Sequence, residues 1–233
     1  YGIVLDGGIY YMITEWPGKG TLYEYLKTNR NVPWTQKIRW ASRLARALAF
    51  CHNKLILHHD IRSHNVIVDM NDNVRLANYH RARGMKDITT SVADETDGVR
   101  WLCPEKVMDS NLSYSKEADV YSFGMLMWEI SSHEIPFVDK TVGGVYTLLR
   151  HSANLEDKDA PRPPIVSGTP KKYGKIMKKC WGQKPGHRPT MAEVVTKLEL
   201  LEETYKENQQ EADNHHYCSS MQESEPQHES ITI

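Results

Sequence analysis

The sequence predicts an α+β protein that is mostly helical. Two short apolar runs, residues 2–5 and 9–13, flank Asp6-Gly7-Gly8, which is the signature of a β-hairpin. A second hairpin is expected where residues 66–68 and 74–76 flank Met70-Asn71-Asp72-Asn73. Over much of the remaining chain, apolar residues recur at the spacing of one helix face. These observations predict two small strand pairs in a largely helical chain.

Signals of individual helices follow in order along the chain. Thr21 and Glu24 have the spacing of a capping box and open a short helix. Thr35 is expected to cap the next helix, which is long and whose apolar face comprises Ile38, Ala41, Leu44, Ala45, Leu48 and Cys51. Residues 118–130 form an apolar run that is long enough to be a buried helix. Further helices are expected over residues 142–150, 171–181 and 190–205.

Composition excludes several classes of function. The chain has 233 residues, of which 39% are hydrophobic and 25% are charged, and its net charge is −1. These values are typical of a globular protein with a core. No apolar run approaches the roughly 18 residues of a transmembrane helix, and no basic stripe indicates nucleic acid as a partner. The four cysteines have no CxxC spacing, so we expect reduced thiols in a cytoplasmic protein.

The last segment, residues 207–233, differs from the rest of the chain in composition. It holds six acidic residues, no Lys or Arg, and few apolar residues. Such a segment buries too little apolar surface to offset the entropy of ordering, so we expect it to be disordered. It ends in Ile231, Thr232 and Ile233, an apolar-x-apolar carboxyl terminus that can dock in a PDZ groove by strand addition. Simple disorder without such a partner is the alternative.

Several motifs occur in an order and at a spacing that resemble a known family. They are His58-His59-Asp60-Ile61-Arg62-Ser63-His64-Asn65, Leu76-Ala77-Asn78-Tyr79-His80, Trp101-Leu102-Cys103-Pro104-Glu105, Asp119-Val120-Tyr121-Ser122-Phe123-Gly124, and Cys180-Trp181 with Arg188-Pro189-Thr190. Over roughly residues 1–205 the chain resembles protein kinases of the tyrosine-kinase and tyrosine-kinase-like branch. The resemblance implies a protein-kinase-like fold, with a helical C-terminal lobe over residues 21–206. Residues 1–20 would then be the last strands of the N-terminal lobe and the hinge.

The resemblance also implies a phosphoryl-transfer site. Asp60 stands in the position of the catalytic base, Arg62 near the transferred phosphate, and Asn65 in the position of a magnesium ligand. Asn78 stands in the position of the other metal ligand. The implied cofactors are ATP and Mg²⁺, and the adenine ring would be bound by Thr14, Glu15, Pro17, Ile67 and Ala77.

The structural residues of the family are retained. The resemblance implies that Glu105, near the end of the activation segment, forms an ion pair with Arg188. It also implies that Asp119 braces the backbone of the catalytic loop. All three residue types are present at the family's spacing, so we expect the architecture of the large lobe to be intact.

Other positions depart from the family pattern. Asn78 replaces the Asp that coordinates Mg²⁺, and a neutral amide in place of a carboxylate costs on the order of several kcal/mol of metal affinity. Pro17 has no N–H to donate to adenine, a loss of about 0.5–1.5 kcal/mol. His59 replaces the Arg that would pair with a phosphorylated residue. The Gly-rich loop, the phosphate-binding Lys and its Glu partner would all precede residue 1, so we expect the true N-terminus to lie upstream.

Three functions are compatible with this pattern. The first is a pseudokinase that binds protein partners as a scaffold or allosteric regulator, with impaired binding of ATP and Mg²⁺. The second is an active protein kinase that transfers the γ-phosphate of ATP to a protein hydroxyl, with Asp60 as the base. The third is a kinase-homology segment of a larger signalling protein, such as that of receptor guanylate cyclases. Retained structural residues beside a degraded metal site favour the first.

Overall fold

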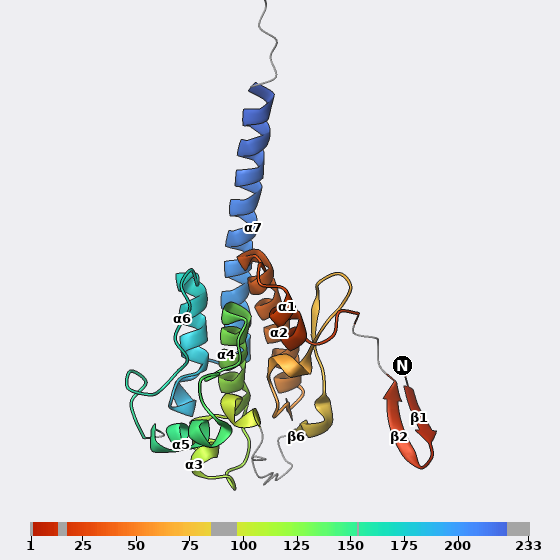
Figure 1. Cartoon of the computed structure of the whole chain (residues 1–233), viewed down its shortest axis with the longest axis vertical. Coiled ribbons are helices and arrows are strands. Elements are labelled where there is room, and N and C mark those ends of the chain that lie inside the picture. The colour runs from red at the N-terminus through yellow and green to blue at the C-terminus, as the bar shows by residue number, and fades with distance from the viewer. Residues whose placement is uncertain (1, 14–17, 85–96, 153, 223–233) are drawn as a thin grey trace, which may run out of the picture.

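The computed structural model of the protein describes residues 2–13, 18–84, 97–152 and 154–222. Its strands form three antiparallel pairs, β1 (Gly2–Asp6) with β2 (Ile9–Ile13), β3 (Ile56–Leu57) with β6 (Arg83–Gly84), and β4 (Val66–Val68) with β5 (Val74–Leu76). Its helices, shown in Figure 1, are α1 (Leu22–Thr28), α2 (Trp34–Asn53), α3 (Pro104–Met108), α4 (Lys116–Ser132), α5 (Val142–Ser152), α6 (Lys171–Cys180) and α7 (Met191–Gln222). The predicted fold class, α+β and mostly α, is confirmed.

The first hairpin forms around the predicted turn. Gly7 and Gly8 have φ values of 55° and 81°. A two-residue type I′ turn requires positive φ at both positions, and glycine adopts it without a Cβ clash. The β1 side chains are exposed along the whole strand, and Figure 1 shows the hairpin lying apart from the helices. The hairpin therefore contributes little to the core of the described residues.

Helix α4 is the centre of the core. Thirteen of its 17 residues are buried, which agrees with the predicted buried helix. Ser115 caps its N-terminus by accepting a hydrogen bond from the Ala118 N–H at 3.3 Å. Gly124 lets the chain after α6 approach closely, because a Cβ at this position would lie 2.9 Å from the backbone nitrogen of Trp181. The helix is therefore fixed between α2 on one side and α6 on the other.

Helix α2 shows the predicted apolar face but not the predicted start. All six residues expected on that face are buried, and they pack against α4 and α7. The helix begins at Trp34, directly after Pro33, so Thr35 lies inside the first turn and not at the cap. The Pro33 ring holds φ near its fixed value, and its extended ψ of 153° ends the preceding segment. The prediction of Thr35 as the cap was therefore wrong.

Helix α7 is longer than predicted. Thr190 and Glu193 form a capping box at its start, and Val194, Leu198 and Leu201 are buried against the body. Figure 1 shows the helix continuing well beyond the body as far as Gln222. Residues 207–222 are thus helical where the sequence predicted disorder. They continue α7 without a break, and extending an existing helix is less costly than starting a new one.

Two predictions are not resolved by this fold. Residues 223–233, with the proposed PDZ-binding terminus, lie outside the described residues. The division of the chain at residues 20 and 206 stays a prediction. None of the helices in the described ranges combines the length and the apolar character that crossing a bilayer requires.

Candidate functional site

The loop that carries Asp60 is held by a buried carboxylate on α4. One oxygen of Asp119 accepts the His58 N–H at 2.8 Å, and the other accepts the His59 N–H at 2.9 Å. The His52 Nε2 atom lies 3.0 Å from the first of these oxygens. Asp119 is only 1% exposed, so these bonds form away from water. The bracing role implied for Asp119 is present, and it fixes the backbone just before Asp60.

His59 is left in a strained and half-buried position by this bracing. Its φ of 67° lies in the left-handed region, which costs a non-glycine residue about 1–2 kcal/mol. Its ring stacks on Tyr114 with a centroid distance of 4.0 Å. Burial lowers the pKa of His59 below its usual value, although the nearby Asp119 raises it. Burial thus disfavours the charged imidazole that would be needed to replace the arginine that pairs with a phosphate.

Asp60 forms an ion pair within its own loop. The Nε atom of Arg62 lies 2.9 Å from Oδ1 of Asp60, and an Arg62 Nη group donates to Oδ2 at 3.3 Å. Asp60 is 8% exposed, beside a cavity of about 40 Å³ that is also lined by Trp101 and Tyr114. Of the three residues predicted to be catalytic, Asp60 and Arg62 are therefore paired, and Asn65 bonds to the backbone carbonyl of Asp60. The carboxylate that would accept a proton lies against the guanidinium that would face the phosphate.

The two amides of the candidate metal site are hydrogen-bonded to each other. The Nδ2 group of Asn65 donates to the backbone carbonyl of Asp60 at 2.8 Å. A carbonyl only accepts, so Oδ1 of Asn65 must face the other way. There it accepts the Nδ2 group of Asn78 at 2.7 Å. The oxygen that Asn65 would offer to a metal ion is thus occupied by the residue that replaces the family's aspartate.

These donors do not fit a magnesium ion. Mg²⁺ prefers anionic oxygen and near-octahedral geometry. Asn65 and Asn78 supply only neutral amides, and the carboxylate of Asp60 is engaged by Arg62. Across the described parts of the chain, no group of three or more His, Cys, Asp or Glu side chains is placed to hold a metal ion. Asn78 has φ 64° and ψ 56°, a left-handed conformation that asparagine tolerates better than most residues.

The residues predicted to contact adenine are only partly described. Thr14, Glu15 and Pro17 lie outside the described residues. Ile67 lies in β4, opposite Arg75 of β5 and bridged to Thr21. The Ala77 N–H donates to the Asn65 carbonyl at 2.9 Å, which links this part of the site to the amide pair. The role of all five residues in binding adenine stays a prediction.

Glu129 is a site residue that the sequence reasoning missed. It lies on α4, is 1% exposed, and accepts hydrogen bonds from the Ser63 N–H at 3.1 Å and from Trp101 Nε1 at 2.7 Å. The Ser63 hydroxyl also donates to it. Burial raises the pKa of Glu129 to about 7, although these hydrogen bonds lower it. An acidic residue inside the apolar run 118–130 was the signal that could have identified it.

The activation segment is anchored as the resemblance implied. Two guanidinium nitrogens of Arg188 donate to the two carboxylate oxygens of Glu105, at 2.6 and 2.8 Å. The same guanidinium donates to the carbonyls of Glu117, Gly182 and Gln183. The Arg188 side chain is fully buried, so the charge pair is shielded from water. This bidentate pair ties the start of α3 to the segment before α7.

Comparison with known proteins identifies the family. The family described as protein tyrosine and serine/threonine kinase matches residues 1–198. A putative serine/threonine-protein kinase/receptor, R831, of Acanthamoeba polyphaga mimivirus is 32% identical over 197 residues, which is 83% of this chain and 11% of that protein. Mitogen-activated protein kinase kinase kinase 13-A of Xenopus laevis is 27% identical over 219 residues, 90% of this chain and 22% of that protein. Mitogen-activated protein kinase kinase kinase 12 of Rattus norvegicus is 25% identical over 219 residues, which is 90% of this chain and 23% of that protein.

The chain belongs to the protein kinase family. It spans less than a quarter of the length of these three relatives. The predicted recognition is confirmed at the level of the family and its signalling relatives. Whether the chain transfers phosphate is a separate question, which depends on the residues of the site.

Proposed function

We propose that this kinase domain acts mainly as a pseudokinase, binding protein partners as a scaffold or allosteric regulator, with impaired binding of ATP and Mg²⁺. The observation that carries the proposal is the hydrogen bond between Asn78 and Asn65. It occupies the metal-facing oxygen of Asn65 and leaves no carboxylate at the position that the family uses for Mg²⁺. The elements around this site keep their structural contacts, including the Asp119 bracing and the Glu105–Arg188 pair. This combination is expected where the fold matters and the turnover does not.

An active protein kinase is the second candidate, and one observation favours it. Asp60 is retained, and its loop is held by Asp119 as a working catalytic loop would be. In that case Asp60 would accept the proton of a protein hydroxyl, and Arg62 would face the transferred phosphate. Which hydroxyl is phosphorylated, and whether the protein works in the cytoplasm, would follow from partners and not from this site.

Thermal unfolding with nucleotide separates the two candidates. A ligand that binds the folded protein at about ten times its Kd adds about 1.4 kcal/mol of stability. For a domain of this size, that is a rise in Tm of about 3–6 °C. For the unaltered protein we expect no additional rise when Mg²⁺ or Mn²⁺ is added to ATP. A metal-dependent rise in that range would favour the active kinase.

The variant Asn78→Asp tests the metal site directly. It restores a carboxylate and removes the NH₂ group that occupies Asn65 Oδ1. We expect Mg²⁺-dependent stabilisation by ATP to appear in this variant. Asn208→Asp is the matched control, because it makes the same charge change at an exposed position of α7. If Asn78→Asp responds to Mg²⁺ no more than Asn208→Asp does, the asparagine pair is not the cause of impaired binding.

A further inference from the structure

Helix α6 presents a face that consists of lysines. Every exposed residue of this helix is a lysine, and the set is Lys171, Lys172, Lys175, Lys178 and Lys179. The other five residues of the helix are buried in the body. The chain as a whole has 29 basic and 30 acidic residues, so this concentration of positive charge is local and not a general excess.

The lysine face is electrostatically unfavourable in the isolated domain. Lys171 and Lys175, like Lys175 and Lys179, are four residues apart, so like charges face each other along the helix. Lys171 and Lys172 also lie at the positive end of the helix dipole. None of the five lysines forms an ion pair with another residue in the described ranges. An unfavourable arrangement without a local partner is expected where function needs the charge.

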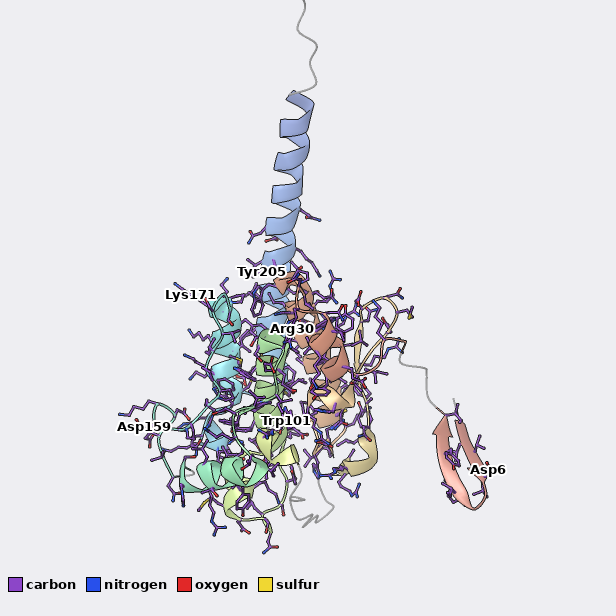
Figure 2. The ribbon with its side chains drawn as sticks, in the orientation of Figure 1. Asp6, Arg30, Trp101, Asp159, Lys171 and Tyr205 are labelled. Atoms are coloured by element: carbon purple, nitrogen blue, oxygen red, sulfur yellow. The ribbon has the colours of Figure 1, made fainter. Side chains whose placement is uncertain are left out.

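An apolar groove lies directly beside these lysines, between α6 and α7. Its volume is about 350 Å³. Its apolar lining comprises Ile176, Pro189, Val194, Leu200 and Leu201, and its basic rim comprises Lys172, Lys175, Lys179 and Lys197. Leu200 is 62% exposed, which is high for a leucine in a packed helix pair. Figure 2 labels Lys171, at the start of α6, at nearly the level of Tyr205 of α7.

The positive charge continues on the other side of α6. A second hollow of about 1020 Å³ shares Lys175 and Lys179 with the groove and also contains Arg162. The guanidinium of Arg162 donates to the carbonyls of Pro161 and Trp181 and to the side-chain oxygen of Gln183. These acceptors are neutral, so the charge of Arg162 adds to that of the lysines. Among the described residues that line the two hollows, Asp157 is the one acidic residue.

We propose that the groove between α6 and α7 docks an acidic peptide segment of a partner protein, with a large apolar side chain of that segment inserted beside Leu200. The charge selects carboxylates, which can reach Lys172, Lys175, Lys179 and Lys197 at the rim. The apolar lining selects the anchor, as in peptide recognition by grooves between helices. The docking site is separate from the Asp60 site and does not depend on whether the chain binds a nucleotide.

The apolar lining distinguishes a peptide from the other anionic partners. A phosphate backbone would engage the lysines but would leave the groove unfilled. A membrane surface is flat, whereas the apolar residues here line a hollow whose floor, formed by Ile176, Val194 and Leu201, is buried. A peptide side chain fits both the charge and the shape.

Fluorescence anisotropy with a labelled peptide tests the proposal. The probe is a 16-residue helical peptide with leucines along one face and glutamates elsewhere, and a second probe has serines in place of the leucines. We expect the first probe to bind the full chain at low salt, and the second to bind about tenfold more weakly. The double variant Lys175→Glu with Lys179→Glu should weaken binding by about tenfold or more, because each exposed ion pair contributes up to a factor of about five. Leu200→Ser should also weaken it.

The matched control is the double variant Lys27→Glu with Lys54→Glu, which makes the same charge change at exposed positions that line neither hollow. It should bind the leucine peptide within about twofold of the unaltered chain, while circular dichroism shows that all variants are folded. Three results would overturn the proposal: no binding of the leucine peptide at 100 μM, equal losses in the α6 and control variants, or binding to phosphatidylserine vesicles without binding to the peptide.

Discussion

Replacing Asp119 by asparagine tests whether one buried carboxylate holds the loop that carries Asp60. The carboxylate accepts three hydrogen bonds, from His58 N at 2.8 Å, His59 N at 2.9 Å and His52 Nε2 at 3.0 Å. The substituted side chain has the same shape, so no cavity forms. However, the asparagine side chain has a single oxygen that can accept hydrogen bonds. Its NH₂ group takes the place of the other carboxylate oxygen and faces a backbone N–H that then has no acceptor. The change therefore isolates the electrostatic role of this residue.

The cost follows from these bonds. A buried N–H group without a partner costs about 1–3 kcal/mol. Each of the two remaining bonds falls from a charge-assisted bond of about 1.5–3 kcal/mol to a neutral bond of about 0.5–1.5 kcal/mol. Together these losses amount to about 4 kcal/mol. Relaxation of His59 from its left-handed conformation, which costs about 1–2 kcal/mol, would recover part of the loss.

Urea unfolding followed by circular dichroism measures this difference. We expect Asp119→Asn to lower the free energy of unfolding by about 3–5 kcal/mol with an unchanged m-value. Glu203→Gln, at an exposed position of α7, removes the same charge and should change stability by less than about 0.5 kcal/mol. A loss below about 1 kcal/mol for Asp119→Asn would refute the reasoning, since the bracing bonds would then contribute little.

Two further predictions concern the buried charges. Arg188→Ala should destabilise the fold by about 3–5 kcal/mol, because it leaves the partly buried Glu105 without its bidentate partner and removes the guanidinium that donates to three backbone carbonyls. Urea unfolding checks this, and Arg39→Ala, at a half-buried arginine that forms no ion pair in the described residues, is the comparison. Glu129→Gln should change how stability depends on pH. The folded pKa of Glu129 is about 7 and its ordinary value is 4.5, so between these pH values the folded state binds more protons than the unfolded state, and stability falls as pH rises. At about 1.4 kcal/mol per pH unit, this loss of stability reaches about 3 kcal/mol at pH 7. Glu129→Gln should not show this loss. Parallel pH profiles of the two proteins between pH 4.5 and 7 would show that Glu129 titrates normally.

Local features of the fold were predictable because short stretches of sequence specify them. The turn at Gly7 and Gly8 needs positive φ at adjacent residues, and glycine adopts it most readily. The apolar face of α2 and the buried run of α4 follow from periodicity and length. The start of α2 and the end of α7 were predicted less well. Caps and ends differ little in free energy, so single residues such as Pro33 decide them.

The candidate site was predictable in its membership but not in its connections. Motif spacing placed Asp60, Arg62, Asn65 and Asn78 in one site. It did not predict that the two asparagines bond to each other, because that depends on the distance between amides that are 13 residues apart in sequence. Glu129 contacts Ser63 across 66 residues, and no sequence pattern records such a contact.

By itself, the sequence determined the class of the fold and the chemical identity of the site, including the loss of a carboxylate at Asn78. Both are properties of residue type and spacing, which the chain carries whether or not it is folded. Only the tertiary structure decided which polar groups find partners. It pairs the amides of Asn65 and Asn78 with each other, and within the described residues it gives the α6 lysines no carboxylate partner. Hydrogen bonds and ion pairs act over a few ångströms, so their partners are chosen by the packing of distant segments and not by the order of residues.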